Sequence, residues 1–194
     1  MKKMLSIFLC SLAFTASAAI PMAPLPSDSI LQIDSTFTNQ DGRNFKLGQR
    51  RGKPQVISMF YTSCPYMCPL MIDSAKAVEH SMSASELGSL SVLLVSIDPV
   101  RDTPKALMSI VNKRKIDTRR WTLARTDEKG VRLLAGVLGI RYRALSNGEF
   151  NHTSVLILLD ADGRILARTE NLGNKPDPLF LAAVKKAVAL KATH

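Results

Sequence analysis

Two cysteines, Cys64 and Cys68, and a distant histidine, His152, are the residues of this chain best suited to chemistry. The third cysteine, Cys10, lies in an apolar N-terminal segment, so Cys64 and Cys68 are the pair that remains in the body of the chain. Two thiols at this spacing can form a disulfide, attack one, or chelate a soft metal ion. An imidazole that folds back onto the pair would favour the metal.

The four-residue spacing of the cysteines constrains where each can lie. In a regular helix their Cβ atoms would be about 5–6 Å apart, whereas a disulfide needs about 3.5–4.5 Å. We therefore expect Cys64 in the loop just before a helix, where it can exchange between a disulfide and a chelate. A purely structural disulfide is the alternative, although so small a ring would constrain the unfolded chain little.

Hydrophobic patterning and turn residues predict strands and helices that would position these side chains. The predicted segments are a hairpin over residues 30–45, strands over 56–61, 90–97, 155–159 and 164–169, and helices over 69–82, 104–113, 127–138 and 178–192. The cysteines follow a central strand and begin a helix, whose N-terminus lowers a thiol pKa through its dipole and free N–H groups. This arrangement predicts an α/β, thioredoxin-like fold with an N-terminal β-hairpin and a C-terminal helix.

The N-terminal segment has the pattern of a secretion signal. Two lysines precede an apolar run over residues 5–14, and Ala16-Ser17-Ala18 has the small-x-small form of a cleavage site. We expect a signal peptide over 1–18, a Pro-rich linker over 19–29 and one domain over 30–194. The cleaved chain would be exported, to the periplasm if its source is bacterial. An uncleaved anchor in the inner membrane is the alternative, although a membrane span needs about 20 apolar residues.

The chain is basic, with 26 lysines and arginines against 16 acidic residues. Loss of the leader's two lysines would change the formal net charge from +10 to +8. The densest basic segment runs from Lys113 to Arg143. It is either a solvated surface or a face that attracts an acidic protein or anionic head groups. Nucleic acid is not an expected ligand, because the chain has an export signal and no binding motif.

Several motifs occur in order over most of residues 30–170. They are Gly52-Lys53-Pro54, Phe60-Tyr61-Thr62, Cys64-Pro65-x-x-Cys68-Pro69, Ser96-Ile97-Asp98-Pro99-x-Arg101-Asp102-Thr103-Pro104 and Phe150-x-His152-Thr153. Together they resemble the Sco/SenC family of copper chaperones, which help to load the binuclear copper centre of cytochrome c oxidase. Two departures are Asn151, where many members have Asp, and residues 145–149, where several members have a longer acidic insertion.

The resemblance implies that Cys64, Cys68 and His152 bind one copper ion per chain, as copper(I) and also as copper(II), and that the cysteines are a redox-active pair. Thioredoxin-like oxidoreductases usually carry a cis-proline before the third central strand, facing the cysteines. Here that place holds His152 and no proline. Asp98 is a candidate for orienting His152 from outside the ligand set, and equally for accepting hydrogen bonds in its own turn. Asp102 is expected to support the turn before the next helix.

Three functions remain open. The first is an exported metallochaperone that delivers copper to, or prepares, the copper-site subunit of cytochrome c oxidase or another acceptor. The second is a thiol–disulfide oxidoreductase that reduces cysteines of a periplasmic partner, served by a thioredoxin-like reductant. The third, a peroxidase, lacks its Thr-x-x-Cys context, because Thr62-Ser63-Cys64 is one residue too short. The Cys-x-x-x-Cys spacing favours a metallochaperone over an enzyme, with thiol reduction as an accessory activity and at most peripheral membrane contact.

Overall fold

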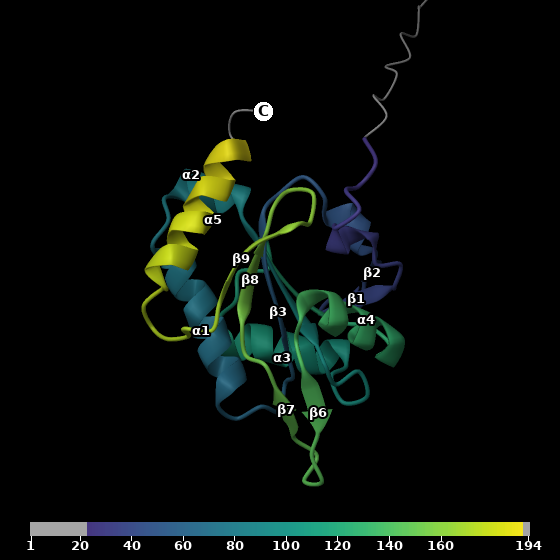
Figure 1. The fold of residues 1–194 in the computed structure, drawn as a ribbon. Helices are drawn as coiled ribbons and strands as arrows, with labels where there is room; N and C mark the ends of the chain where they lie inside the picture. The colour runs from purple at the N-terminus through teal and green to yellow at the C-terminus, as the bar shows by residue number, and fades with distance from the viewer. Residues whose placement is uncertain (1–22, 192–194) are drawn as a thin grey trace, which may run out of the picture.

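The computed structural model describes residues 23–191, which fold into α/β structure around a mixed sheet (Figure 1). The α/β class predicted from the sequence is confirmed. The predicted signal peptide over 1–18, and the linker as far as residue 22, lie outside the described residues. No helix in the described range is long and apolar enough to cross a membrane.

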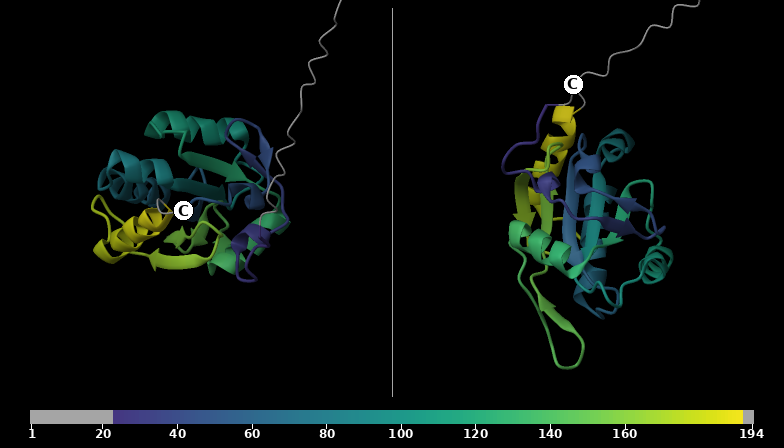
Figure 2. Two further views of the ribbon diagram at one scale, coloured as in Figure 1. Left: turned by 90° about the horizontal axis from the view of Figure 1, so that it is seen from above. Right: turned by 90° about the vertical axis from the view of Figure 1, so that its right-hand side faces the viewer.

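The main sheet has seven strands in the order β2-β1-β5-β4-β3-β8-β9. Their bounds are Phe37–Asn39 (β1), Asn44–Phe45 (β2), Gln55–Phe60 (β3), Ser91–Ser96 (β4), Trp121–Arg125 (β5), Leu156–Leu159 (β8) and Ile165–Thr169 (β9). β3, β4 and β5 are parallel, whereas the other neighbouring strands of this sheet pair antiparallel. A separate hairpin of β6 (Tyr142–Ala144) and β7 (Phe150–His152) projects from one end of the molecule (Figures 1 and 2).

Helices surround the sheet. Their bounds are Met67–His80 (α1), Ala84–Ser89 (α2), Pro104–Arg114 (α3), Glu128–Leu138 (α4) and Pro178–Lys191 (α5), with short 3-10 helices at Ile30–Gln32 (η1) and Leu47–Arg50 (η2). α1 and α3 are joined by an ion pair between Asp73 and Arg114. α5 packs along β8 and β9 and contacts α2, whereas α4 packs against η1. Two of these helices have side-chain N-caps: the Thr103 hydroxyl accepts from the Ala106 N–H at the start of α3, and the Asp127 carboxylate accepts from the Gly130 N–H at the start of α4.

The core lies in the central strands. Every residue of β3 is buried, and so are five of the six residues of β4. A continuous apolar run of this kind is typical of a strand covered on both faces. The largest fully buried side chains include Trp121 of β5, Phe60 of β3 and Phe180 of α5. This packed centre fixes the positions from which the site loops emerge.

The strand directions bring the cysteines and the histidine to one end of the sheet. β3 and β8 pair antiparallel, with Ile57 opposite Ile157 and Gln55 opposite Leu159. The loop that follows β3 therefore meets the segment that precedes β8. Cys64 lies in that loop and Cys68 in the first turn of α1, which follows it, whereas His152 ends β7 in the segment before β8.

The structure corrects several boundaries. Only β1 and β2 form the hairpin predicted over residues 30–45, because the Ser29 hydroxyl caps a short helix at residues 30–32. α1 begins at Met67 rather than at residue 69. β5, α2 and the β6–β7 hairpin were not predicted from the sequence.

Candidate metal centre

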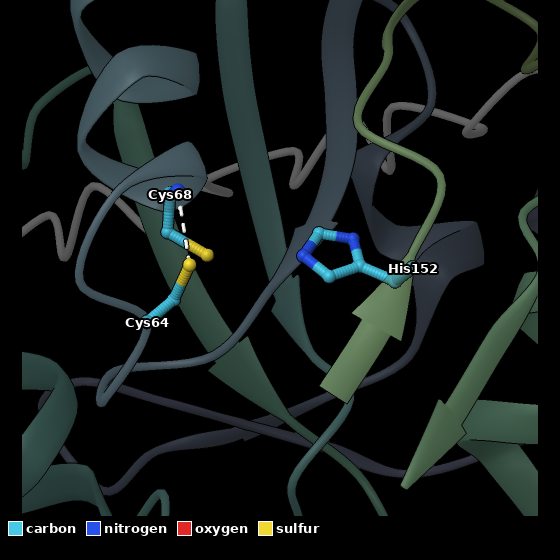
Figure 3. Close-up of side chains that lie close together, drawn as sticks. All are labelled: Cys64, Cys68 and His152. Carbon is cyan, nitrogen blue, oxygen red and sulfur yellow. Dashed lines mark hydrogen bonds between the residues drawn. The ribbon is translucent and has the colours of Figure 1, made fainter. Parts of the chain in front are cut away.

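Cys64, Cys68 and His152 meet at the end of β3. Their donor atoms all lie within 4.8 Å of one another, a grouping that could hold a metal ion. Cys68 is buried, whereas Cys64 and His152 are partly exposed, and both cysteines are free thiols. Figure 3 shows the imidazole facing the two sulfur atoms across a short gap. The three residues that the sequence singles out are therefore brought together.

The loop between β3 and α1 places the two sulfur atoms. Tyr66, the residue before α1, contributes no side-chain hydrogen bond to the helix end. The Cys64 sulfur instead accepts the Cys68 N–H at 3.3 Å (Figure 3). The Cys68 sulfur accepts the Tyr61 N–H at 3.4 Å. Cys64 thus lies in the loop, as predicted, and its sulfur takes the place of a helix cap.

The pKa values of the two thiols are shifted in opposite directions. The pKa of Cys64 is lowered to about 5, first because the Cys68 thiol donates a hydrogen bond to it and then because backbone N–H groups at the start of α1 do the same. The pKa of Cys68 is raised well above its ordinary value by that same hydrogen bond and by burial. At neutral pH the site therefore holds a Cys64 thiolate and a protonated Cys68.

His152 presents one nitrogen to the cysteines. Its Nδ1 lies 3.1 Å from the Thr153 carbonyl oxygen, which can only accept, so Nδ1 carries the proton in this contact. Its Nε2 is buried and has no hydrogen-bond partner among the described residues. A neutral imidazole held in this way offers the Nε2 lone pair as a ligand, the usual arrangement of a metal-binding histidine.

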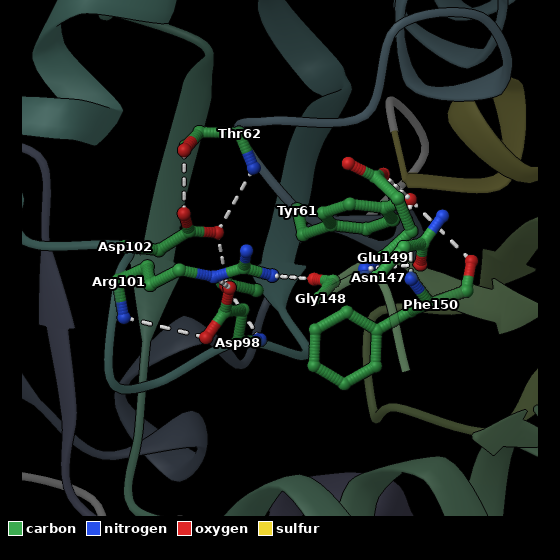
Figure 4. Close-up of polar contacts among 10 residues, drawn as sticks. Tyr61, Thr62, Asp98, Arg101, Asp102, Asn147, Gly148, Glu149 and Phe150 are labelled. Atoms are coloured by element: carbon green, nitrogen blue, oxygen red, sulfur yellow. Dashed lines mark hydrogen bonds and ion pairs between the residues drawn. The ribbon is translucent and has the colours of Figure 1, made fainter. Parts of the chain in front are cut away.

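The β6–β7 hairpin that carries His152 lies outside the main sheet, so side chains must hold it in place. The Tyr61 hydroxyl donates to Glu149 at 2.7 Å and accepts the Phe150 N–H at 3.3 Å (Figure 4). The Tyr61 ring also packs edge-on against the rings of Phe150 and His152, at centroid distances of 5.3 Å and 5.8 Å. Tyr61 therefore joins the end of β3 to the hairpin, and burial raises its pKa.

Arg101 is a second anchor for the hairpin. Its guanidinium donates to the Asp98 carboxylate and to the Gly148 carbonyl oxygen in the turn between β6 and β7 (Figure 4). It also lies 5.8 Å from the centroid of the Phe150 ring. The Asp98 carboxylate accepts hydrogen bonds from Arg101 and none from His152. The hydrogen-bonded connection from Asp98 toward His152 therefore runs through Arg101 and the hairpin.

Asp102 anchors the start of the cysteine loop. Its carboxylate is fully buried and accepts from the Thr62 N–H at 3.0 Å and from the hydroxyls of Thr62 and Ser96 (Figure 4). The sequence predicts only that Asp102 supports the turn before α3. In the structure it also ties that turn to the loop two residues before Cys64, and burial raises its pKa.

A cavity of about 240 Å³ opens beside the cysteines. Its lining includes both thiols, Ile72 of α1, and Lys113 and Arg114 at the end of α3. The first members of the predicted basic segment thus adjoin the site. Arg114 is paired with Asp73, whereas Lys113 is exposed.

The sequence did not identify Tyr61, Arg101 or Glu149 as site residues. Tyr61 and Arg101 lie in motifs that carry the family resemblance, so a signal existed without an assigned role. Glu149 lies in a short polar turn with no pattern to mark it.

Met71, one turn beyond Cys68, is fully buried, and its sulfur accepts a hydrogen bond from Ser58 at 3.3 Å.

Known proteins share this architecture. The SCO1/SenC family model matches residues 25–189. A SCO1 protein homolog of Bacillus subtilis is 25% identical over 159 residues, which are 80% of this chain and 82% of the homolog. A SCO1/SenC family lipoprotein of Bacillus anthracis superposes with a TM-score of 0.71 at 23% identity, over 78% of this chain and 91% of the other. Bradyrhizobium japonicum ScoI, solved with copper bound, gives a TM-score of 0.66 at 21% identity, over 79% and 96%.

These matches confirm the thioredoxin-like fold expected from the order of elements and the place of the cysteines. They also agree with the motifs read from the sequence, since the matched residues include the cysteine pair, the Asp98–Pro104 segment and His152. The chain belongs to the SCO1/SenC family.

Proposed function

We propose that this protein is an exported metallochaperone that binds one copper ion as cargo through Cys64, Cys68 and His152. The observation that carries the proposal is the buried Nε2 of His152, which has no hydrogen-bond partner among the described residues and lies with two sulfurs inside 4.8 Å. A buried nitrogen without a partner is costly in a folded protein. Coordination of a metal would satisfy it.

The donor set fits copper better than a hard cation. Two thiolates and one imidazole are soft and borderline ligands, which favour copper(I) and can also hold copper(II). Cys64 is ready as a thiolate because its pKa is about 5, whereas Cys68 must release its proton when it binds. A copper-bound structure of the family relative ScoI supports the same choice of metal.

We propose cytochrome c oxidase, through its copper-site subunit, as the acceptor, in the compartment to which the signal peptide directs the chain. The family resemblance supports the acceptor, and the leader pattern supports export. The surface around the site is suited to docking. Tyr66 is 81% exposed and Met67 39% exposed beside the cysteines, and Lys113 adjoins them. Aromatic side chains and a charged rim are typical of protein interfaces.

The two thiols also support a second candidate function, reduction of a partner disulfide. The Cys64 thiolate would attack the disulfide and release one partner thiolate, and Cys68 would then attack the mixed disulfide and release the second. The partner gains two electrons and this protein becomes a Cys64–Cys68 disulfide, which an external dithiol must reduce. The unequal pKa values of the two thiols favour this order of attack.

Anaerobic copper(I) titration of the reduced protein, in competition with a chelator, tests the first proposal. We expect one equivalent to bind, and His152→Ala to weaken binding by at least about tenfold, the scale of one lost ligand or its support. His80→Ala is the matched control, because His80 is exposed at the end of α1. Equal affinity of the two variants would exclude His152 as a ligand.

Experiments on the protein in defined redox and copper-loaded states distinguish the two functions. A Cys64–Cys68 disulfide has no thiolates, so it should bind no copper. Mixing the copper-loaded protein with a pre-reduced copper-site domain of the oxidase should transfer the metal. Mixing the reduced, copper-free protein with the oxidised domain should instead report thiol exchange. Exchange without transfer would favour the oxidoreductase.

A further inference from the structure

A second cavity lies at the end of the sheet opposite the cysteines. It has a volume of about 630 Å³ and is lined by the segment before β3, by α2, and by the starts of β4 and β5. Its charged lining residues are all cationic: Arg50, Lys53, Arg119 and Arg120. β3 separates it from the cysteine loop, and six residues of strand span about 20 Å. Figure 1 shows α2 and the β6–β7 hairpin at opposite ends of the molecule.

Arg50 is the central feature of this cavity. Its Nε donates to the Gln55 side-chain oxygen at 2.7 Å, and its Nη1 donates to the Thr122 hydroxyl at 3.0 Å. It forms no ion pair with any acidic residue in the described part of the chain. A guanidinium has five N–H donors, so three remain after these two bonds.

The other cations differ in how they are neutralised. Lys53 donates to the Gly88 carbonyl oxygen at 3.0 Å and, like Arg50, has no acidic partner among residues 23–191. Arg119 pairs with Asp117 at 2.8 Å, and Arg120 pairs with both Glu79 and Asp117. Four cations thus face two carboxylates, neither of which lines the cavity. Arg50 and Lys53 account for the excess positive charge.

A desolvated cation without a counter-ion is unfavourable. Burial lowers the pKa of Arg50 to about 10, which leaves it charged at neutral pH. The neutral partners Gln55 and Thr122 orient the guanidinium without cancelling its charge. The planar fork that remains matches two oxygens of a tetrahedral oxyanion, and a nearby ammonium adds a second charge.

We propose that this cavity binds a phosphate-type oxyanion through Arg50 and Lys53. The ligand is either free phosphate or the phosphate of an anionic lipid head group, since both present the same oxygens. The site is independent of the copper site, because no residue lines both cavities.

The first test is a calorimetric titration of the full-length purified protein with inorganic phosphate at constant ionic strength. We expect saturable binding, weakened at least about tenfold by Arg50→Gln, since the charged hydrogen-bond donor to the anion is lost. Lys53→Gln, at an exposed position, provides a second variant if Arg50→Gln does not fold. Arg43→Gln is the charge-matched control, because the exposed Arg43 lies outside the cavity.

The second arm identifies the source of the phosphate. Phosphatidylcholine vesicles with and without phosphatidic acid are sedimented with the wild type and the same variants. If the protein binds only the vesicles that contain phosphatidic acid, and Arg50→Gln or Lys53→Gln abolishes this binding, the ligand is the lipid. If the protein binds phosphate but no vesicles, the ligand is the free ion. The proposal is overturned if phosphate does not bind, if neither variant weakens binding more than Arg43→Gln does, or if acetate binds as tightly as phosphate.

Discussion

At the scale of single residues, the chemistry of this site depends on the difference between two neighbouring thiols. Cys64 accepts hydrogen bonds from the Cys68 thiol and from backbone N–H groups, so its negative charge is stabilised. Cys68 is buried and donates, so its proton is retained. In the function proposed above, this asymmetry would make Cys64 the first nucleophile and the first ligand.

The first prediction concerns the pH dependence of alkylation. The rate at which iodoacetamide alkylates Cys64 in the reduced, copper-free protein should be half-maximal near pH 5, the pKa of this thiol. It should fall below that pH, because protonation removes the thiolate, and stay nearly constant from about pH 6 to 8. Cys68→Ala should raise the midpoint, because the largest cause of the lowered pKa is lost. A midpoint near the ordinary thiol value of about 8.5 in the wild type would contradict the assignment.

The second prediction concerns Asp102. Asp102→Asn replaces one acceptor oxygen with an amide that faces donors from Thr62 and Ser96. We expect a loss of about 1–3 kcal/mol in unfolding free energy, as for a buried hydrogen-bonding group left without its partner. Asp41→Asn, in an exposed turn, is the control. Equal urea midpoints for the two variants would show that Asp102 does not anchor the loop.

At the scale of elements, the position of His152 depends on how the β6–β7 hairpin is held. The hairpin shares no strand pairing with the main sheet. Tyr61 and Arg101 fix it through Glu149, Phe150 and Gly148 (Figure 4). These contacts hold the strand that carries His152 beside the two sulfurs.

The third prediction follows from this arrangement. Tyr61→Phe leaves Glu149 and the Phe150 N–H without their partner, so copper affinity should fall about 5- to 150-fold, the equivalent of about 1–3 kcal/mol. Hydrogen exchange in the copper-free protein should become faster at residues 142–152 only. Arg143→Gln, exposed on the same hairpin, is the matched control. Unchanged exchange in Tyr61→Phe would mean that the hairpin is held by other contacts.

The elements that sequence patterning predicts are those with a clear apolar face. The continuous apolar runs of β3 and β4 indicate buried strands, and the caps at Thr103 and Asp127 mark helix starts. β5 was missed because arginines directly precede Trp121, and α2 because six residues are too short to show a helical period. None of the six strand residues of the β6–β7 hairpin is buried, since three are partly exposed and three are exposed, so the hairpin shows no alternation of buried apolar and exposed polar residues.

The candidate site, like the fold, could be predicted only in part from the sequence. Cys64, Cys68 and His152 stand out by residue type and motif, but their support comes from contacts between distant segments. The Tyr61–Glu149 hydrogen bond joins residues separated by 88 positions, and the Thr62–Asp102 bonds join residues separated by 40. Local pattern carries no information about such pairs.

At the scale of the whole molecule, the basic residues near the cysteines differ in exposure and in pairing. Lys113 adjoins the cysteine cavity, Arg114 is paired with Asp73, and Lys115 is exposed. A positive rim beside the site would attract an acidic partner and speed its association. Salt would screen this attraction, because the Debye length is about 8 Å at physiological ionic strength.

The fourth prediction tests this rim. Lys113→Glu combined with Lys115→Glu should slow copper transfer to an acidic acceptor domain about tenfold at low salt and less at moderate salt. Arg114 is left in place to keep its pair with Asp73. Lys185→Glu with Lys186→Glu, on α5, makes the same change in net charge elsewhere. Equal rates for the two double variants would show that the rim is an ordinary solvated surface.

In the proposed function, one metal ion binds to both thiolates and to the His152 imidazole. X-ray absorption spectroscopy of the reduced protein loaded with one equivalent of copper(I) tests it most directly. The structure predicts two sulfur ligands and one imidazole nitrogen, with the imidazole signal lost in His152→Ala and kept in His80→Ala. Fewer than two sulfur ligands, or an imidazole signal that persists in His152→Ala, would exclude this set of three ligands.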